Sequence, residues 1–502
     1  MNGTAFAGQV ESFRTVLASR LGLEFDDAKL AQLADVLRTR LDISGLQAGP
    51  YLACLQAEAS RTELGAIAQE LTVPETYFFR NIDHLHALRE HVVPERVKAG
   101  GGDRGLRILS AGCASGEEPY SIAMMLHDLP HGQSPELSIR ALDLNPAMVK
   151  KARQARYTNW AMRDTPPAML QRWFRSEGRE FVLDDRIRNA VKFEERNLNE
   201  DDADLWQPGA YDVIFCRNVL MYFTRSRAQA VVARIAHALA PGGYLFLGHA
   251  ETLRGLSQAF HLRHTHGTFY YQRKDETEQE LESASADVPG DAGPFLAAAV
   301  QGSDSWVEAI GKASERVRAL TELKTPDGSE PKASRRWHLG QALDLFQQER
   351  FAEALGLVQA LPAAAARDPD VLLLRAVLLV HSGQLELAED ACHRLLGIDE
   401  LNAGAHYAMA LCREGAGDAR GATDRDQRAA HLDPAFAMPR MHLGLLARRT
   451  GDREAAQREL SQAIVLLQRE DASRLLLFGG GFGREALLAL CRAELQACLG
   501  SP

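Results

Sequence analysis

Apolar residues recur every three or four positions over residues 1 to about 75, which is the period of an amphipathic helix. Three such stretches cover residues 10–23, 26–41 and 49–57. They predict a small helical domain at the amino terminus, which we place at residues 1–90. Acids slightly outnumber the arginines in these stretches, so the domain surface is either an ordinary solvated one or a substrate-docking face.

The stretch Leu71–Asn81, L-T-V-P-E-T-Y-F-F-R-N, joins a polar turn to two aromatic residues and an arginine. Thr76 is placed to cap a following helix, with Phe78 and Phe79 in the core. On this interpretation Arg80 is a surface residue.

The period changes at Ile108–Tyr120, I-L-S-A-G-C-A-S-G-E-E-P-Y. Apolar strand residues lead into a turn of small residues, and Glu117 and Glu118 then open a helix. Gly112 and Gly116 remove side chains where the backbone passes close to a neighbour or takes a positive φ. Doubly wound folds bind nucleotides at such a turn, although this one matches neither G-x-G-x-x-G nor a P-loop. Taken alone, this stretch is explained equally well by a tight strand-to-helix turn that binds no ligand.

The next predicted strand, L-S-I-R-A-L-D-L, ends in Asp143. An acid at this distance beyond the glycine turn holds the ribose diol in nucleotide-binding folds. The alternative is a helix cap over Asp143–Pro146. From about residue 157 to 193 the alternation of strand and helix pauses, and a helical piece followed by a hairpin-like pattern predicts a small antiparallel insertion.

Strand and helix then alternate again, through Y-D-V-I-F-C, a helix over Thr224–Leu239 and Y-L-F-L-G-H. Two short strands follow, A-F-H-L-R-H and T-F-Y-Y-Q, with too few residues between them for a helix. Such strands pair antiparallel, so the sheet is predicted to end with a reversed strand. Residues 91–274 therefore form an α/β domain.

The segment 275–333 begins with D-E-T-E-Q-E-L-E-S-A-S-A-D, which has no basic residue and few apolar ones. It cannot bury enough surface to order itself and is predicted to be an acidic flexible linker. One isolated helix is expected within it, over Ser305–Leu323.

Beyond the linker, small residues and turn glycines repeat with the 34-residue period of tetratricopeptide repeats. The pattern predicts an all-α solenoid over 334–502, with units at 335–368, 369–402, 403–436 and 437–470. A last helix, E-A-L-L-A-L-C-R-A-E-L-Q-A, is expected to cover the final repeat. The preceding F-G-G-G-F-G is read as a flexible join rather than a phosphate site. The repeating positions are Ala354, Ala388, Ala422 and Ala456, and Gly383, Gly417 and Gly451.

Composition agrees with this organisation: 502 residues, 46% hydrophobic and 25% charged, indicate a soluble chain of two or three domains. A net charge of −10 argues against a general nucleic-acid binder. The seven cysteines form no C-x-x-C pair, so no metal site and no disulfide framework are expected. No apolar run reaches bilayer length and the first residues do not resemble a signal peptide, so we expect a cytoplasmic protein without membrane insertion.

Residues 1–274 resemble, in order and over their whole length, the CheR-type chemoreceptor methyltransferases. The motifs that carry the resemblance are T-Y-F-F-R, S-A-G-C-A-S-G-E-E-P-Y-S-I-A, D-L-N, N-L and F-C-R-N-V-L-M-Y-F. The resemblance implies a Rossmann-like, seven-stranded domain that uses S-adenosylmethionine and whose last strand is antiparallel. It also implies O-methylation of glutamates on the cytoplasmic helices of methyl-accepting chemoreceptors.

The repeats match a subset of this family that includes regulators of surface behaviour and biofilm formation, and they imply a further protein partner. The resemblance also assigns roles to residues near the cofactor. Asp143 would take the ribose, and Asn197 with Leu198 would flank the adenine. The full set of expected cofactor-binding residues is Thr76, Arg80, Gly112, Glu118, Asp143, Asn197, Leu198, Arg217 and Asn218.

The expected catalytic residues are Arg80, Arg217 and Tyr222, near the methyl group and the reacting carboxylate. One departure is Pro74, where relatives often carry Asn, so one cofactor hydrogen bond is either missing or supplied by the backbone. A glutamate carboxylate, with a pKa of about 4.3, is already an ionised nucleophile at neutral pH. The enzyme must therefore orient and desolvate it rather than deprotonate it.

Two rival interpretations remain. One is a small-molecule methyltransferase on the same fold, since fold does not fix substrate. The helical amino-terminal domain and the insertion argue against it. The other is a non-catalytic repeat scaffold with a relic methyltransferase domain, against which the intact glycine loop, Asp143 and Arg80 argue.

Overall fold

The computed structural model describes residues 3–57, 60–72, 75–100, 105–127, 129, 137–249, 251–275, 339–348, 350–361, 365–480 and 482–499. The chain divides into two compact units, Met1–Glu251 with Ala259–Pro289, and Thr252–Gln258 with Gly290–Pro502. We describe each unit by itself. The linker beyond Asp275, the expected helix Ser305–Leu323 and the departure at Pro74 fall outside the described residues.

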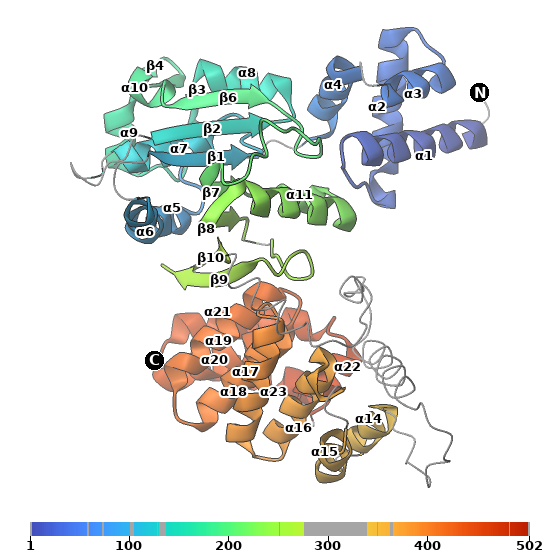
Figure 1. Cartoon of the computed structure of the whole chain (residues 1–502), viewed down its shortest axis with the longest axis vertical. Helices are drawn as coiled ribbons and strands as arrows, with labels where there is room; N and C mark the ends of the chain where they lie inside the picture. Colours follow the sequence, from blue (N-terminus) through green and yellow to red (C-terminus); the bar gives the residue numbers. More distant parts are fainter. Residues whose placement is uncertain are drawn as a thin grey trace, which may run out of the picture. The chain divides into compact units, whose positions relative to one another are not determined.

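The first unit starts with the predicted small helical domain (Figure 1). Its helices surround side chains with no exposed surface, among them Phe13, Leu17, Leu33 and Leu37. The period of three and four residues therefore identified a real buried face. The helices are α1 Gly3–Arg20, α2 Leu30–Ser44, α3 Ala48–Gln56 and α4 Arg61–Leu71, with a 3₁₀ turn at Asp27–Lys29.

Residues 75–81 form no helix, so the expected capping role of Thr76 is wrong. The next helix begins at Ile82, with Asn81 at its N-cap in the left-handed region at φ 58°. Phe78 and Phe79 are buried as expected. The helical run then comprises α5 Ile82–Ala87, a π-helical turn Leu88–Val92 and α6 Val93–Ala99.

Leu88 and Val92, on this helical run, are buried in the core of the central sheet and not in that of the amino-terminal helices. Structurally, the α/β domain therefore starts near Phe78, earlier than the expected residue 91. A helical period shows which face is buried but not which core receives it.

The predicted central sheet has seven strands in the order β6-β2-β1-β7-β8-β10-β9. Pairing is parallel from β6 to β8, while β10 runs antiparallel to both of its neighbours. The last strand in the chain is thus reversed as predicted, but β9 forms the sheet edge. Its elements are β1 Leu106–Ala111, α7 Glu117–His127, β2 Leu137–Asp143, α8 Pro146–Gln154, β6 Val191–Glu195, β7 Tyr211–Cys216, α11 Arg225–Ala238, β8 Leu239–Leu247, β9 Phe260–Thr265 and β10 Thr268–Arg273.

The insertion is an antiparallel sheet in the order β3-β5-β4. It ends at Leu183, and the last strand of the expected hairpin, Val191–Glu195, pairs instead with β2 of the main sheet. Along the chain, the short helix α10 lies between β5 of the insertion and β6 of the main sheet. The sequence pattern did not predict this helix. The bounds are β3 Arg156–Thr158, a 3₁₀ turn Asn159–Met162, α9 Pro167–Trp173, β4 Phe174–Glu177, β5 Glu180–Leu183 and α10 Asp185–Arg188.

The second unit contains the predicted helix pairs of the repeats (Figure 1). Ala354, Ala388, Ala422 and Ala456 have no exposed surface, which explains why small residues repeat where two helices meet. Gly383, Gly417 and Gly451 all have positive φ, so they are turn positions that favour glycine. The pairs are α14 Leu339–Gln347 and α15 Phe351–Gln359, α16 Pro369–His381 and α17 Leu385–Ile398, α18 Ala403–Gly415 and α19 Ala419–Leu432, and α20 Ala437–Thr450 and α21 Arg453–Leu467, with a 3₁₀ turn at Ala365–Arg367.

Two further helices follow the repeats, α22 Ala472–Phe478 and α23 Arg484–Leu499. Helix α23 packs against α21, in line with the prediction for the last helix. The sequence pattern missed α22. Its Phe478 is buried and stacks edge-on against Tyr407 and Phe436 of the repeats, so the start of the F-G-G-G-F-G stretch is packed in place. Within the described residues, no helix is long and apolar enough to span a membrane.

Candidate active site

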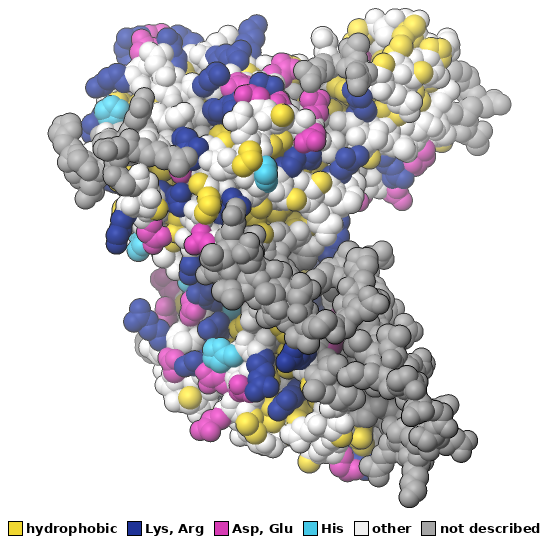
Figure 2. Space-filling model, in the orientation of Figure 1, with side chains coloured by type: hydrophobic (Ala, Val, Ile, Leu, Met, Phe, Trp, Pro, Cys, Tyr) yellow, Lys and Arg dark blue, Asp and Glu magenta, His cyan; other side chains and the backbone are white. Residues whose placement is uncertain are grey.

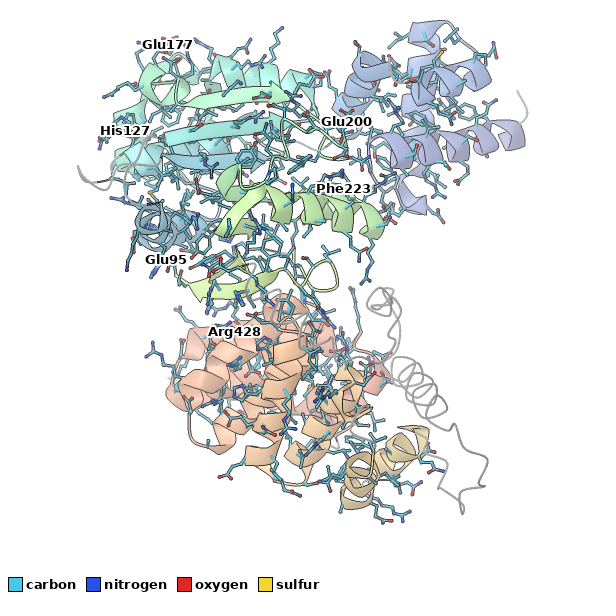
Figure 3. The ribbon with its side chains drawn as sticks, viewed as in Figure 1. Glu95, His127, Glu177, Glu200, Phe223 and Arg428 are labelled. Carbon is cyan, nitrogen blue, oxygen red and sulfur yellow. The ribbon has the colours of Figure 1, made fainter. Side chains whose placement is uncertain are left out.

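A cavity of about 400 Å³ lies in the first unit, within the range of roughly 300–1,000 Å³ that is typical of small-molecule sites. Its walls come from the carboxyl ends of β1, β2 and β7 and from residues 21–25 of the amino-terminal domain. The two parts are joined by main-chain pairing, because Leu23 bridges Phe223 and Glu24 N–H donates to the Tyr222 carbonyl at 2.7 Å. Phe223 is labelled in Figure 3.

The glycine turn forms the base of the cavity. Gly112 has φ 77°, and a Cβ built on it would lie 2.4 Å from Cγ2 of Val219. Both reasons for a glycine therefore hold, the positive φ and the close approach of a neighbour. Gly112 and Cys113 donate their N–H groups to the Leu142 carbonyl at 2.8 and 2.9 Å. These two bonds hold the start of the glycine turn against the end of β2.

Asp143 ends β2 and faces the turn after β1. Its Oδ2 accepts the Ala114 N–H at 2.7 Å, and its Oδ1 accepts the Asn145 N–H at 2.8 Å. The helix cap is Asn145, whose side chain accepts from Ala147 and Met148, so the capping alternative for Asp143 is wrong. Burial raises the pKa of Asp143, and the main-chain N–H groups partly offset this rise. Each oxygen keeps a further lone pair for a hydroxyl group.

Glu118 and Arg217 form a buried ion pair, with Nη1 of Arg217 3.0 Å from Oε2 of Glu118. Ser110 Oγ donates to the other oxygen of Glu118 at 2.8 Å, and Nη2 of Arg217 donates to the Asn81 side-chain oxygen. Burial lowers the pKa of Arg217, and the charge of Glu118 opposes this effect. Both terminal nitrogens of Arg217 are therefore engaged within the protein, so it holds Glu118 and Asn81 in place.

Arg80 reaches the cavity from the Leu71–Asn81 stretch, whose described part also lines it through Thr76 and Tyr77. Nη1 of Arg80 donates to the Glu75 carbonyl at 2.9 Å, and its guanidinium lies 5.7 Å from the centre of the Tyr77 ring. The surface interpretation of Arg80 is wrong, because the side chain is half-buried and faces the cavity. Its remaining N–H groups suit a carboxylate ligand.

The two residues that we expect to flank the adenine also line the cavity. Asn197 is buried and its amide is already engaged, since Nδ2 donates to the Arg20 carbonyl at 3.1 Å and Oδ1 accepts the Asn199 N–H at 2.9 Å. Leu198 and the neighbouring Leu144 supply apolar surface. Asn197 therefore fixes the wall against the amino-terminal domain, and a flat ring would contact the apolar side chains beside it.

The cavity brings together every residue that the sequence had marked for it: Thr76, Arg80, Gly112, Glu118, Asp143, Asn197, Leu198, Arg217, Asn218 and Tyr222. Sequence reasoning missed Ser110 and Asn81, which fix the ion pair, and the Leu21–Phe25 wall. Asn81 directly follows Arg80, so the motif itself was a usable signal. Ser110 carried none, because a serine inside a buried strand looks like packing.

The charges around the site fit a small zwitterionic ligand. Two carboxylates, Glu118 and Asp143, lie in the same cavity as Arg80 and Arg217. Over the α/β domain, basic and acidic side chains are interspersed in the view of Figure 2. Among the residues that the structure describes, no cluster of His, Cys, Asp or Glu could hold a metal ion.

S-adenosylmethionine fits this set of groups. Asp143 offers acceptors for a ribose diol, Leu144 and Leu198 offer an apolar face for a purine, and Glu118 offers a carboxylate for an ammonium group. Gly112 has no side chain and Val219 fills the space that a Cβ would take, so the glycine turn and loop 217–222 lie close together in the cavity wall.

Comparisons with known proteins also indicate a methyltransferase that binds S-adenosylmethionine. Residues 74–269 match the family model "CheR methyltransferase, SAM binding domain". Chemotaxis protein methyltransferase 2 of Vibrio cholerae is 36% identical over 265 residues, which cover 52% of this chain and 91% of that protein. The probable biofilm formation methyltransferase WspC of Pseudomonas aeruginosa is 30% identical over 460 residues, which cover 89% of this chain and 96% of that protein.

The WspC protein of Pseudomonas putida is 29% identical and covers 89% of this chain and 96% of its own length. Among solved structures, the crystal structure of MamA protein is 19% identical with a TM-score of 0.23, covering 32% of this chain and 90% of that chain. The two WspC matches extend through the repeats, whereas the Vibrio cholerae match covers only about half of the chain.

Proposed function

Since this chain belongs to the CheR family of S-adenosylmethionine-dependent methyltransferases, we propose that it methylates glutamate side chains of methyl-accepting chemoreceptors. When bound, the cofactor supplies a sulfonium methyl group: a carboxylate oxygen forms the new bond to that carbon while the carbon–sulfur bond breaks and its electron pair stays on sulfur. The products are a glutamate methyl ester and S-adenosylhomocysteine. No proton moves, so no catalytic base is required.

The observation that carries the proposal is that Arg80 and Tyr222 share one cavity with Asp143 and Glu118. Asp143 and Glu118 are suited to the cofactor, whereas Arg80 and Tyr222 can donate hydrogen bonds to a substrate carboxylate. Arg217, whose terminal nitrogens bind Glu118 and Asn81, acts as a support for the cofactor carboxylate ligand rather than as a direct grip on the substrate. This division of roles modifies the expectation that all three groups hold the glutamate.

The experiment is transfer of a labelled methyl group from S-adenosylmethionine to a cytoplasmic receptor fragment by the full chain and by Arg80→Lys. We expect the variant to lose at least tenfold in kcat and less than threefold in affinity for S-adenosylhomocysteine, since lysine keeps the positive charge but lacks the planar fork. Arg38→Lys, at an exposed ion pair on α2, is the matched control. Full activity of Arg80→Lys would remove Arg80 from substrate positioning, and a wild-type chain that binds cofactor but labels no receptor would refute the proposed substrate.

For the repeats, we propose binding of a second protein that recruits or regulates the methyltransferase. Two observations support this: stacked helix pairs usually serve protein binding, and the similarity to the two WspC proteins runs through the repeats. The test compares residues 1–274 with the full chain on the same receptor, with and without cell extract. Identical rates, methylation sites and partners for the two chains would refute a regulatory role.

A further inference from the structure

Glu251, just beyond β8, binds the loop 217–222, although it does not itself line the cavity. Its side chain is only 5% exposed, so its charge must be met by protein groups. Four main-chain N–H groups meet it, two at each carboxylate oxygen. Oε2 accepts from Asn218 at 2.6 Å and from Gly248 at 2.8 Å, and Oε1 accepts from Val219 at 2.9 Å and from Met221 at 3.2 Å.

We call Glu251 and these four N–H groups the loop clasp. Asn218 lies in the left-handed region at φ 58°, and Val219 follows at φ −121° and ψ −46°. Successive main-chain N–H groups in a turn of this kind can point toward the same side and form an anion-binding concavity. The Glu251 carboxylate occupies that concavity, and charge-assisted bonds of this kind are roughly twice as strong as neutral ones. The carboxylate thus stabilises the unusual turn.

Gly248, at the end of β8, is part of the same arrangement. A Cβ at this position would lie 2.8 Å from Oε2 of Glu251 and 2.8 Å from Nδ2 of Asn218. The carboxylate can therefore reach the loop only where residue 248 has no side chain. This gives a second way to disturb the clasp, one that leaves the glutamate in place.

The clasp sets the position of groups on both sides of the turn. On one side, Arg217 reaches Glu118 and Asn81. On the other side, Tyr222 lines the cavity and its carbonyl accepts from Glu24 of the amino-terminal domain. Between them, Val219 lies against Gly112 of the glycine turn. Loss of the clasp would remove the main-chain hydrogen bonds that Asn218, Val219 and Met221 donate to Glu251.

We propose that Glu251 is a positioning residue of the methyltransferase, which fixes loop 217–222 so that Arg217 holds Glu118 toward the cofactor and Tyr222 meets the substrate in the right geometry. The proposal rests on the proposed function for its catalytic consequence, while its structural part concerns this chain alone. A carboxylate that only stabilises the fold would affect the melting temperature but not the loop. The same domain contains such a carboxylate for comparison.

The carboxylate for comparison belongs to Asp212, which lies near the start of β7, the strand that leads to Arg217. It is also 5% exposed, accepts the Arg107 N–H at 3.0 Å and pairs with Arg96 at 3.2 Å. It does not line the cavity. Asp212→Asn should therefore cost stability without moving the loop.

The test uses the full chain with Glu251→Gln, Gly248→Ala, both changes together and Asp212→Asn. Glutamine keeps the shape but has one carbonyl oxygen, so one pair of N–H groups would face an NH₂ group. We expect kcat for receptor methylation to fall at least thirtyfold in Glu251→Gln and Gly248→Ala. The Kd for S-adenosylhomocysteine should rise less than tenfold, because Asp143 at the end of β2 and Leu198 in the turn after β6 lie outside loop 217–222. Amide exchange at residues 218–221 should accelerate at least tenfold.

Asp212→Asn should lower the melting temperature yet keep kcat and amide exchange at 218–221 within threefold of wild type. The double variant should be little worse than either single change, because both disturb one clasp. Wild-type kcat and exchange in Glu251→Gln would overturn the proposal, as would an equal kcat loss in Asp212→Asn. If Glu251→Gln does not fold, Gly248→Ala decides by the same measures. A wild type that methylates no receptor refutes the proposed function, while exchange and product binding still test the clasp.

Discussion

Arg217 and Glu118 meet at 3.0 Å with side chains only 4% and 14% exposed, so each compensates the charge of the other in a nearly dry site. Removing one partner of a buried pair leaves an uncompensated charge and costs on the order of 3–5 kcal/mol. Arg217→Ala should therefore lower the melting temperature of the first unit by several degrees and weaken binding of S-adenosylhomocysteine. Calorimetry of both properties checks this.

The matched control is Arg38→Ala. Arg38 pairs with Asp35 at 2.6 Å, but the two side chains are 58% and 75% exposed. Exposed pairs contribute little because solvent screens them. Equal losses in melting temperature for Arg217→Ala and Arg38→Ala would show that the Arg217–Glu118 pair contributes no more to stability than an exposed pair.

Asp143→Ala should weaken S-adenosylmethionine binding tenfold or more. Two hydrogen bonds to a charged acceptor are worth about 1.5–3 kcal/mol each, and about 1.4 kcal/mol is one decade in Kd. Because burial raises the pKa of Asp143, affinity in the wild type should begin to fall at a higher pH than for an ordinary aspartate as the solution is acidified. Titration calorimetry at several pH values measures both effects, and unchanged affinity in Asp143→Ala would exclude this residue from the site.

Gly112→Ala tests the close contact between the glycine turn and loop 217–222. The new Cβ would lie 2.4 Å from Val219, whereas at Gly178, also in the left-handed region with φ 66°, nothing lies within 4 Å. Both substitutions carry a conformational cost of about 1–2 kcal/mol. Only Gly112→Ala should also lose cofactor binding, by at least tenfold. Equal binding in the two variants would mean that the contact does not shape the site.

The repeats contain a buried group of three side chains that should make their stability depend on pH. Nδ1 of His442 lies 2.6 Å from Oδ2 of Asp426, and Nε2 lies 2.9 Å from Oε2 of Glu414. Burial alone would lower the pKa of His442, but the two carboxylates outweigh it and raise the pKa. Burial raises the pKa of Asp426 to about 6, against the opposing effect of His442.

Both raised pKa values mean that these two side chains bind more protons in the folded repeats than in the unfolded chain, so their contribution to stability falls as pH rises. For Asp426 the loss runs from its unfolded value of about 3.9 to about 6. For His442 it continues above about 6.5. We expect this group to make the melting transition of the repeats a few degrees lower at pH 8 than at pH 5, against the opposite effect of His406, whose pKa burial lowers to about 3. His442→Gln should flatten this difference, while His393→Gln, at a 55% exposed side chain, should not. Identical slopes in the two variants would contradict the account.

The parts of the structure that could be predicted from sequence are those fixed by local patterns. The turn after β1, Asp143 at the end of β2 and Arg217 after β7 follow from strand periodicity, because parallel strands place their carboxyl ends at one edge. The 34-residue step placed Ala354 and its equivalents in the helix contacts for the same local reason.

Other features depended on contacts between distant segments. The run around Leu88 has a helical period that is equally compatible with either core, and β6 resembles the second half of a hairpin until its partner is known. Glu251 is a single acid in an unremarkable stretch, yet it meets N–H groups about thirty residues earlier in the chain. No periodicity signals such a contact, since its partners are main-chain groups that any residue carries.

The most direct measurement of the central claim is to locate the transferred methyl group. Full-length protein, S-adenosylmethionine and a cytoplasmic receptor fragment are incubated, and the receptor peptides are sequenced by mass spectrometry before and after mild alkali. The account predicts methyl groups on glutamate side chains that alkali releases as methanol, with several-fold slower labelling by the Asp143→Ala chain at cofactor concentrations near the wild-type Kd. Alkali-stable methyl groups on other residues, or methylation of small molecules but not of the receptor, would contradict it.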